Sequence, residues 1–201
     1  MARMGNGTAS PQAMKQPASW STLAPEEIEL PPPRVLNLKT IRDTAGAAIT
    51  YAAAVKLDPA FVYIGRDMPA HGLAGSEWAN MVKLAEDTPE ARAEAVREYV
   101  RRKLDDPNRC DLGALAGRSM ICWCAPKICH GDALAELIKC TRFYGSKCPH
   151  CGAPVKSFLT WHEGLQVLAE AWVCTARQCD RRGERRREIP SCLLTAQPML
   201  L

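Results

Sequence analysis

The sequence predicts an α/β domain with a parallel sheet, followed by a small module that is built around a metal. Between residues 34 and 140, apolar runs that suit buried strands alternate with segments of helical periodicity, and this order is typical of parallel α/β domains. Beyond residue 140, a C-x-x-C motif and a later cysteine pair indicate a zinc ribbon. The predicted architecture is therefore a small Rossmann-like parallel-sheet domain and a zinc-ribbon module.

Composition limits the class of protein. A chain of 201 residues with 47% hydrophobic residues is long and apolar enough to form one domain with a hydrophobic core and one small additional module. The formal net charge of +4 permits a nucleic-acid partner without requiring one. Ten cysteines without a hydrophobic leader favour metal binding and reduced thiols over a disulfide framework. No stretch is long enough to cross a membrane, so we expect a cytoplasmic protein with no membrane partner.

Residues 1–33 are rich in Ala, Ser, Pro, Gly and Gln and lack a sustained apolar period. This composition predicts a disordered segment. A transit peptide is the alternative, which the sparse basic residues Arg3 and Lys15 and the nearby glutamates disfavour.

Local signals predict the first elements of the α/β domain. Residues 35–38 and 61–64 suit strands, and residues 47–55 suit an alanine-rich helix or a buried apolar segment. The Thr88-Pro89 pair is a helix start, with the hydroxyl at the N-cap and the proline at the first helical position, and this helix should run to about residue 104.

The loop after the second strand is glycine-rich and carries one arginine at the strand end. Arg66 could hold a phosphate or carboxylate by a forked contact, with main-chain donors from the Gly75-Ser76 turn. An ordinary turn is an equally good interpretation of this loop alone. The predicted ligand-binding residues are Gly65, Arg66, Gly75, Ser76 and Asn80 from this loop, together with Cys122 from a later strand described below.

The stretch from Arg118 to Lys139 packs a strand, a polar loop and a helix start into a short length of chain. Residues 119–124 suit a buried strand, and Asp132 stands where a helix N-cap acceptor would be. If residues 121–124 are extended, Cys122 and Cys124 share one face. The unpaired N–H groups at the start of the following helix favour binding of an anion. If Asp132 caps this helix, however, its carboxylate already occupies these donors, and Asp132 would then bind a sugar hydroxyl or accept a proton. The candidate catalytic residues are Cys124, Cys129, His130 and Asp132.

A second interpretation of this stretch is a metal site. Cys122, Cys124, Cys129 and His130 have suitable donor types, although C-x-C on one strand followed by adjacent Cys-His is awkward for a tetrahedral site. A catalytic thiol and plain packing with ligand contact are the other possibilities.

The motifs V-L-N, V-Y-I-G-R, G-S-E-W-A-N and I-C-W-C-A-P-K-I-C-H-G-D-A-L-A-E-L occur in this order between residues 34 and 139. Together they resemble the bacterial and phage domain-of-unknown-function family numbered 4326. The resemblance implies an α/β domain whose motifs at residues 65–66, 75–76, 80 and 122–132 belong together, and it supplies no reaction. The chain departs from the family pattern in the Trp78–Val82 loop, which lacks the usual proline, and in a longer segment at residues 47–59.

The second module begins with Cys148-Pro149-His150-Cys151-Gly152, a zinc knuckle in form. Predicted strands at residues 155–161 and 171–174 lead to a second pair spaced C-x-x-x-x-C, which leaves His150 or His162 possible as a substitute ligand. Structural zinc is the expected cofactor, because so small a module has too little hydrophobic core to be stable without a bound metal or another cross-link. The alternative is that the cysteines are buried and bind no metal. The predicted ligands are Cys148, Cys151, Cys174 and Cys179.

A dense arginine run follows between residues 177 and 187, near Trp161 and Trp172. Such a patch suits nucleic-acid phosphates and base stacking, and a solvated tail explains it equally well. The predicted units are thus residues 34–140, 141–180 and a basic, then apolar, tail at 181–201.

Two classes of function fit these observations. The first is an enzyme that acts on a nucleotide, nucleoside or nucleic-acid base. Analogy with Rossmann-like domains that process nucleosides suggests that it would cleave a glycosidic bond. The second is a non-catalytic adaptor whose α/β domain senses a nucleotide while the ribbon and arginine run hold nucleic acid or a protein.

Overall fold

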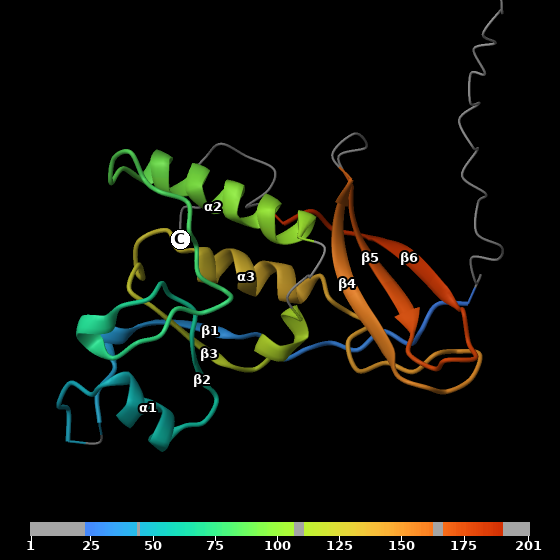
Figure 1. Ribbon diagram of the computed structural model, residues 1–201, viewed down its shortest axis with the longest axis horizontal. Helices are drawn as coiled ribbons and strands as arrows, with labels where there is room; N and C mark the ends of the chain where they lie inside the picture. Colours follow the sequence, from blue (N-terminus) through green and yellow to red (C-terminus); the bar gives the residue numbers. More distant parts are fainter. Residues whose placement is uncertain (1–22, 44, 107–110, 163–166, 191–201) are drawn as a thin grey trace, which may run out of the picture.

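Two sheets of different kinds lie side by side, joined through a pair of helices (Figure 1). The computed structural model describes residues 23–43, 45–106, 111–162 and 167–190. The fold is therefore mixed α/β, with a small parallel sheet in the first part of the chain and a separate antiparallel sheet in the second.

The parallel sheet has three strands in the order β1-β3-β2. These are β1 (Arg34–Asn37), β2 (Phe61–Tyr63) and β3 (Ser119–Cys122), and β3 pairs in parallel with both neighbours. Met120 and Ile121 are fully buried because the central strand is covered on both faces. The alternating order of strands and helices thus correctly predicted a parallel sheet.

Helices cover both faces of this sheet (Figure 1). On one side, α1 (Tyr51–Leu57) packs with Ile121, and on the other side α2 (Pro89–Asp105) and α3 (His130–Lys139) pack with Met120. Short 3-10 turns at Leu38–Thr40, Pro69–His71 and Leu112–Leu115 complete the unit. The start of α2 is as predicted, because the Thr88 hydroxyl accepts a hydrogen bond of 3.1 Å from the Ala91 N–H.

The antiparallel sheet consists of β4 (Val155–His162), β5 (Val167–Cys174) and β6 (Arg182–Arg187), in that order. Gly183 of β6 lies opposite Trp172 of β5. A Cβ atom at Gly183 would lie 2.6 Å from the indole Nε1 of Trp172. Glycine is therefore required here, because the indole packs flat against the strand and becomes buried.

The arginine run forms a strand, and this corrects the predicted tail beginning at residue 181. Arg185 and Arg187 lie on the same face of the sheet as Glu170, and both contact Glu27. A run of charged residues is stable as a strand here because acidic partners lie on its inner face. Base stacking by Trp172 is also excluded, since only 2% of that residue is exposed.

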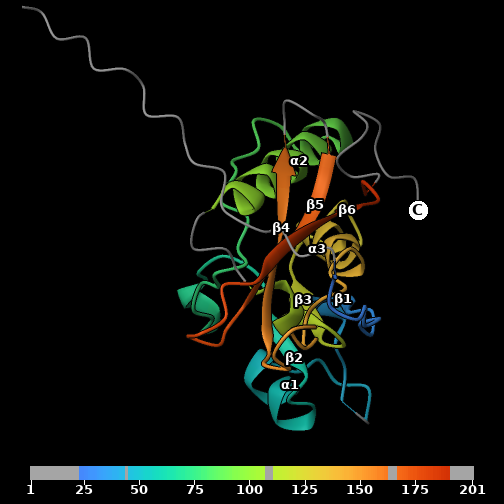
Figure 2. The same ribbon diagram turned by 90° about the vertical axis from the view of Figure 1, so that its right-hand side faces the viewer.

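The antiparallel sheet shares a core with the helices. Leu159 of β4 and Leu168 of β5 belong to the same buried cluster as Val100 of α2 and Leu137 of α3. Figure 2 shows the three strands lying in front of α2 and α3. The second module is therefore packed directly on the α/β unit.

Residues 24–33 lie against the body of the protein, so the prediction of disorder is wrong for this part. The Ile28 N–H donates to the Arg142 carbonyl at 2.7 Å, and the Ser146 hydroxyl donates to the Glu26 carbonyl at 2.6 Å. Residues 1–22 and the apolar segment 192–201 lie outside the described residues. Among the described helices, none has the length and apolar character that a membrane span requires.

Candidate metal centres and the adjoining cavity

The loop after β3 differs from the predicted extended strand. β3 ends at Cys122, and a turn closed by a 3.0 Å hydrogen bond from the Lys127 N–H to the Cys124 carbonyl follows it. The peptide bond between Ala125 and Pro126 in this turn is cis. Cys122 and Cys124 are therefore brought together by a turn, and not by alternation along one strand.

The N-cap of helix α3 lies three residues before the predicted one. Cys129 is its N-cap, and its sulfur accepts a hydrogen bond of 3.3 Å from the Gly131 N–H. Asp132 consequently lies in the first turn and is not the cap. Burial raises the pKa of Asp132, against the opposing effect of the Cys129 backbone N–H.

Gly131 allows the start of α3 to approach the sheet closely. A Cβ atom there would lie 2.9 Å from side-chain carbons of both Ile64 and Val35. Without this close approach the adjacent His130 could not reach the end of β3.

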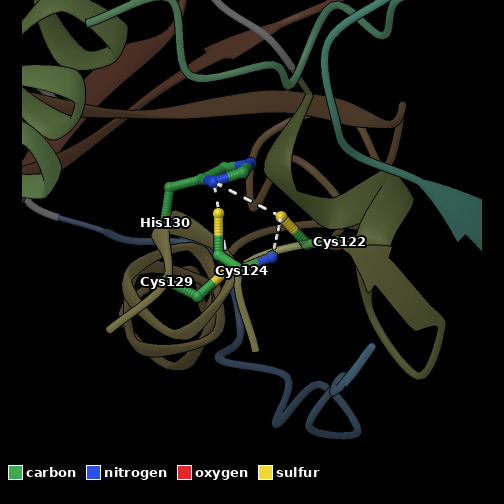
Figure 3. Close-up of side chains that lie close together, drawn as sticks. All are labelled: Cys122, Cys124, Cys129 and His130. Carbon is green, nitrogen blue, oxygen red and sulfur yellow. Dashed lines mark hydrogen bonds between the residues drawn. The ribbon is translucent and has the colours of Figure 1, made fainter. Parts of the chain in front are cut away.

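Four side chains converge at the end of β3 (Figure 3). The sulfurs of Cys122, Cys124 and Cys129 and a ring nitrogen of His130 all lie within 4.8 Å of one another. Nδ1 of His130 is 4.0 Å from the Cys122 sulfur and 3.9 Å from the Cys129 sulfur. Cys122, Cys129 and His130 are buried, whereas Cys124 is partly exposed.

The other nitrogen of His130 sets the orientation of the ring. Nε2 lies 2.9 Å from the Ile64 carbonyl oxygen, just after β2. The carbonyl can only accept, so Nε2 carries a proton and Nδ1 is the nitrogen that faces the sulfurs. The edge of the Tyr99 ring, with its centroid 5.1 Å away, holds the imidazole from the other side.

The electrostatics of the cluster couple its groups strongly. Burial lowers the pKa of His130, but the Cys122 and Cys124 side chains outweigh it and the pKa rises to about 9. Hydrogen bonds with Cys122, Cys129 and His130 hold the pKa of Cys124 far below its ordinary value. The side chains of Cys122 and Cys124, together with burial, raise the pKa of Cys129. The metal-free cluster therefore favours one thiolate beside an imidazolium.

Asn37 positions this loop, and the sequence analysis did not single it out as a site residue. Its amide donates to the carbonyl oxygens of Ala125 and, at 3.4 Å, Trp123, while its side-chain oxygen accepts from the Lys39 N–H at 2.8 Å. The available signal was its place in the V-L-N motif at a strand end. Asn37 thus ties the end of β1 to the loop that carries Cys124.

A cavity of about 270 Å³ lies at the carboxyl ends of β2 and β3, and the cysteine–histidine cluster forms part of its wall. Of the predicted ligand-binding residues, Gly65, Arg66, Asn80 and Cys122 line it. Gly75 and Ser76 do not. The N–H of Ser76 donates to the Gly65 carbonyl, and its hydroxyl accepts from the Trp78 N–H, so this residue shapes the loop. Of the candidate catalytic residues, Cys124 and His130 line the cavity, and Cys129 and Asp132 do not.

Arg66 and Asn80 stabilise one side of the cavity. Nε and Nη2 of Arg66 donate to the carbonyl oxygens of Asn80 and Val82, at 2.5 and 2.7 Å. The Asn80 side chain accepts from the Val82 N–H at 2.9 Å. Arg66 therefore brings its charge to the cavity while two of its donors hold the loop.

Arg92 of α2 supplies a second cation that was not among the predicted ligand-binding residues, because an arginine at helical spacing more often lies on a solvent-exposed face. It lines the cavity and pairs with Asp87, which also binds Lys127 at 2.8 Å. Hydrogen bonds from Arg92 and Lys127 lower the pKa of Asp87 to about 2. Tyr63 and Trp123 complete the wall with aromatic surface.

The four predicted ribbon cysteines also come together. The sulfur atoms of Cys148, Cys151, Cys174 and Cys179 lie within 4.8 Å of one another. The Cys151 and Cys174 sulfurs are 3.5 Å apart, and those of Cys148 and Cys179 are 3.9 Å apart. The two histidines considered as substitutes are not part of this group, and His162 instead contacts Glu184 at 3.3 Å.

Local hydrogen bonds prepare the ribbon cluster for a metal. Burial raises the pKa of Cys148, but the backbone N–H groups of Cys151 and His150 outweigh it and bring the pKa to about 7. The Ala176 N–H donates to the Cys174 sulfur at 3.4 Å. All eight cysteines in the described part of the chain are free thiols, as the composition predicted, and both clusters could hold a metal ion.

Comparison with known proteins bears on the α/β unit. Neither the curated proteins nor the solved structures include a match to this chain. Residues 49–140 match the model of a family described as a domain of unknown function, DUF4326. The matched region contains β2, β3, α1, α2 and α3 and every side chain of the cysteine–histidine cluster. The family whose model matches residues 49–140 is therefore the one that the motifs resemble.

Proposed function

We propose that the α/β unit binds a small anionic ligand of the nucleotide or nucleoside class in the cavity beside β2 and β3. The observation that carries the proposal is the position of this cavity. Ligands of parallel α/β sheets bind outside the carboxyl ends of the strands, and both β2 and β3 end at this cavity. On this basis we also propose that the three strands are a reduced Rossmann-like sheet.

The chemistry of the wall supports this class of ligand. Arg66 and Arg92 place positive charge at the cavity, which favours a phosphate or another anion. Tyr63 and Trp123 offer aromatic surface for a base. Apolar side chains such as Val96 fill the remaining wall, as is usual for small-molecule sites.

Catalysis on that ligand, including cleavage of a glycosidic bond, is the enzymatic form of the proposal. Cys124 and His130 are the candidate catalytic residues that line the cavity. The other members of their cluster are thiols, and Asp132 does not line the cavity, so the geometry supports ligand binding more directly than acid–base catalysis. For the ribbon cluster we propose structural zinc, because four thiolates are a common ligand set of that ion.

A ligand of this class will raise the melting temperature (Tm) of the protein. At a ligand concentration of 100 times Kd, binding adds about 2.7 kcal/mol of stability. The protein should be melted with a panel of nucleotides and nucleosides, and each mixture should then be chromatographed for products. Arg92→Gln should abolish most of the Tm shift, because it removes a cation from the cavity wall. A product peak would establish the enzymatic form, and a shifted Tm without product would establish a binding domain.

The matched control for this experiment is Arg102→Gln. Arg102 lies on the same helix as Arg92 and pairs with Glu98 at an exposed position away from this cavity. The control should retain the wild-type shift. A panel that leaves the wild-type Tm unchanged, or an equal loss of shift in both variants, would contradict the proposal.

A second candidate function is nucleic-acid binding by the antiparallel sheet. Arg182 and Arg186 are exposed on β6, and within the described ranges neither takes part in an ion pair. They lie on the opposite face from Arg185 and Arg187, which contact Glu27. Two arginines that are not neutralised by acids on an exposed strand suit phosphate contacts.

This second proposal predicts a salt-dependent affinity. Binding of a fluorescent single-stranded oligonucleotide should weaken as salt rises, with a log–log slope of about 0.7 per phosphate contact. The double substitution Arg182→Glu and Arg186→Glu should weaken binding and flatten this slope, whereas Arg102→Gln should change neither. A slope that is the same in the double variant and the wild type would exclude this surface.

A further inference from the structure

We propose that Cys122, Cys124, Cys129 and His130 form a second mononuclear zinc site, in the wall of the cavity and separate from the zinc ribbon. The site is defined by donor atoms that lie within 4.8 Å of one another. The proposal does not depend on the identity of the cavity ligand.

The spacing of the donors suits one tetrahedral ion. Zn–S bonds of about 2.3 Å and a Zn–N bond of about 2.0 Å place tetrahedral sulfurs roughly 3.8 Å apart, and a nitrogen and a sulfur roughly 3.5 Å apart. The distances from His130 Nδ1 to the sulfurs of Cys122 and Cys129 are 4.0 and 3.9 Å, a few tenths of an ångström longer than such an N–S pair. The ribbon cluster has the same spacing, with sulfur pairs 3.5 and 3.9 Å apart. The C-x-C motif is compatible with this geometry because the chain turns after Cys122.

The surrounding hydrogen bonds prepare these groups as ligands. The bond from His130 Nε2–H to the Ile64 carbonyl leaves Nδ1 free to coordinate, which is the usual arrangement of a zinc-bound histidine. The Gly131 N–H and the Cys124 N–H donate to the sulfurs of Cys129 and Cys122, at 3.3 and 3.5 Å. Donors of this kind, one of them at a helix N-terminus, stabilise thiolates.

The donor set selects the metal. Three thiolates and one imidazole are soft and borderline ligands, which suit zinc and disfavour magnesium and calcium. An iron–sulfur cluster places several irons and sulfides between its ligands, so it requires a wider set than atoms within 4.8 Å. A zinc ion with three thiolates has a net charge of −1, and Arg92 interacts electrostatically with Cys124 from the facing helix.

The ligands are unequally accessible. Cys122, Cys129 and His130 are 2%, 1% and 4% exposed, whereas Cys124, which lines the cavity together with Cys122 and His130, is partly exposed. The ion would therefore be held from the protein side by three buried ligands, with the Cys124 sulfur facing the cavity. Loss of the ion would release the loop that forms the cavity wall.

The test is the amount of zinc and iron per chain in the purified full-length protein, measured by mass spectrometry under reducing conditions. We expect two zinc ions in the wild type, one in Cys129→Ser and one in Cys151→Ser. Cys140→Ser is the matched control and should retain two, because Cys140 belongs to neither cluster of the described residues and its sulfur donates to the carbonyls of Glu136 and Glu188.

Cobalt substitution tests the ligands without relying on a buried substitution. Titration of the metal-free wild type should give thiolate-to-cobalt absorption that saturates at two equivalents. Cys124→Ser replaces the least buried ligand, and it should change the absorption spectrum of one of the two bound cobalt ions. One zinc per chain that is retained in Cys124→Ser and Cys129→Ser, cobalt saturation at one equivalent, or iron at this cluster would overturn the proposal.

Discussion

If the ribbon cluster binds structural zinc as proposed, Cys151→Ser will abolish that binding and cause the largest loss of stability of any single substitution considered. The metal of a zinc-finger peptide contributes roughly 10–16 kcal/mol of binding free energy to folding. Here the cluster is packed on a small core of Phe143, Val155 and Trp172, separate from the main core that holds Leu159 and Leu168, so this part of the sheet should depend most on the metal. Because Cys151 is exposed, its replacement by serine loses little packing, and the effect reports the metal.

Differential scanning calorimetry with and without a zinc chelator measures this effect. The wild type should lose its high-temperature transition in chelator, and Cys151→Ser should lack that transition in both conditions. Trp172 fluorescence should shift to longer wavelength, since this side chain is buried only while the sheet is formed. Cys140→Ser should melt like the wild type. If Cys151→Ser melts at the wild-type temperature, and if chelator does not change that temperature, the ribbon does not contain a structural metal.

Glu170→Ala will destabilise the protein by about 3–5 kcal/mol, the usual cost of breaking a buried ion pair by removing one partner. Glu170 is 0% exposed. Its carboxylate accepts hydrogen bonds from the N–H groups of Arg142 and Phe143, at 2.9 and 2.8 Å, and from Arg187 at 2.5 Å. The substitution leaves the two backbone donors without their acceptor, and the Arg187 guanidinium keeps only its contact with Glu27 among the acids of the described residues. The link between α3 and the antiparallel sheet should weaken most.

Urea denaturation followed by circular dichroism measures the free energy of unfolding of this variant. A double-mutant cycle with Arg187→Met should give a coupling energy well above that of an exposed pair, because the Arg187 side chain is 8% exposed. Arg186→Met is the control, since Arg186 is the exposed neighbour on the same strand, and its cost should be within about 0.5 kcal/mol. Equal effects of the two arginine substitutions would show that the buried pair does not stabilise the fold.

Much of the fold followed from local signals. The Thr88-Pro89 pair located the start of α2, and the β-branched and aromatic run at Phe61 located β2, because capping and strand propensity act over a few residues. The four cysteines of the ribbon cluster could also be grouped from their spacing, since a C-x-x-C turn can present two thiolates to one ion. Residues 24–33 were misjudged because they are ordered by backbone hydrogen bonds to distant segments, which composition does not report.

The arginine strand shows a similar limit. Nothing local in residues 182–187 indicates a strand, and their charges suggested a tail. Their order depends on Glu170 and Glu27, which are distant in sequence. Only packing brings these acids to the inner face of β6.

For the cysteine–histidine cluster, the sequence by itself determined the donor types and their order along the chain. The tertiary structure decided that the donors face one another. Alternation along a strand could not predict this, because β3 ends at Cys122 and the turn after it is held by Asn37 from β1. The start of α3 likewise depends on the contact of Gly131 with two strands. Long-range contacts therefore set the geometry of ligands whose chemistry was already evident in the sequence.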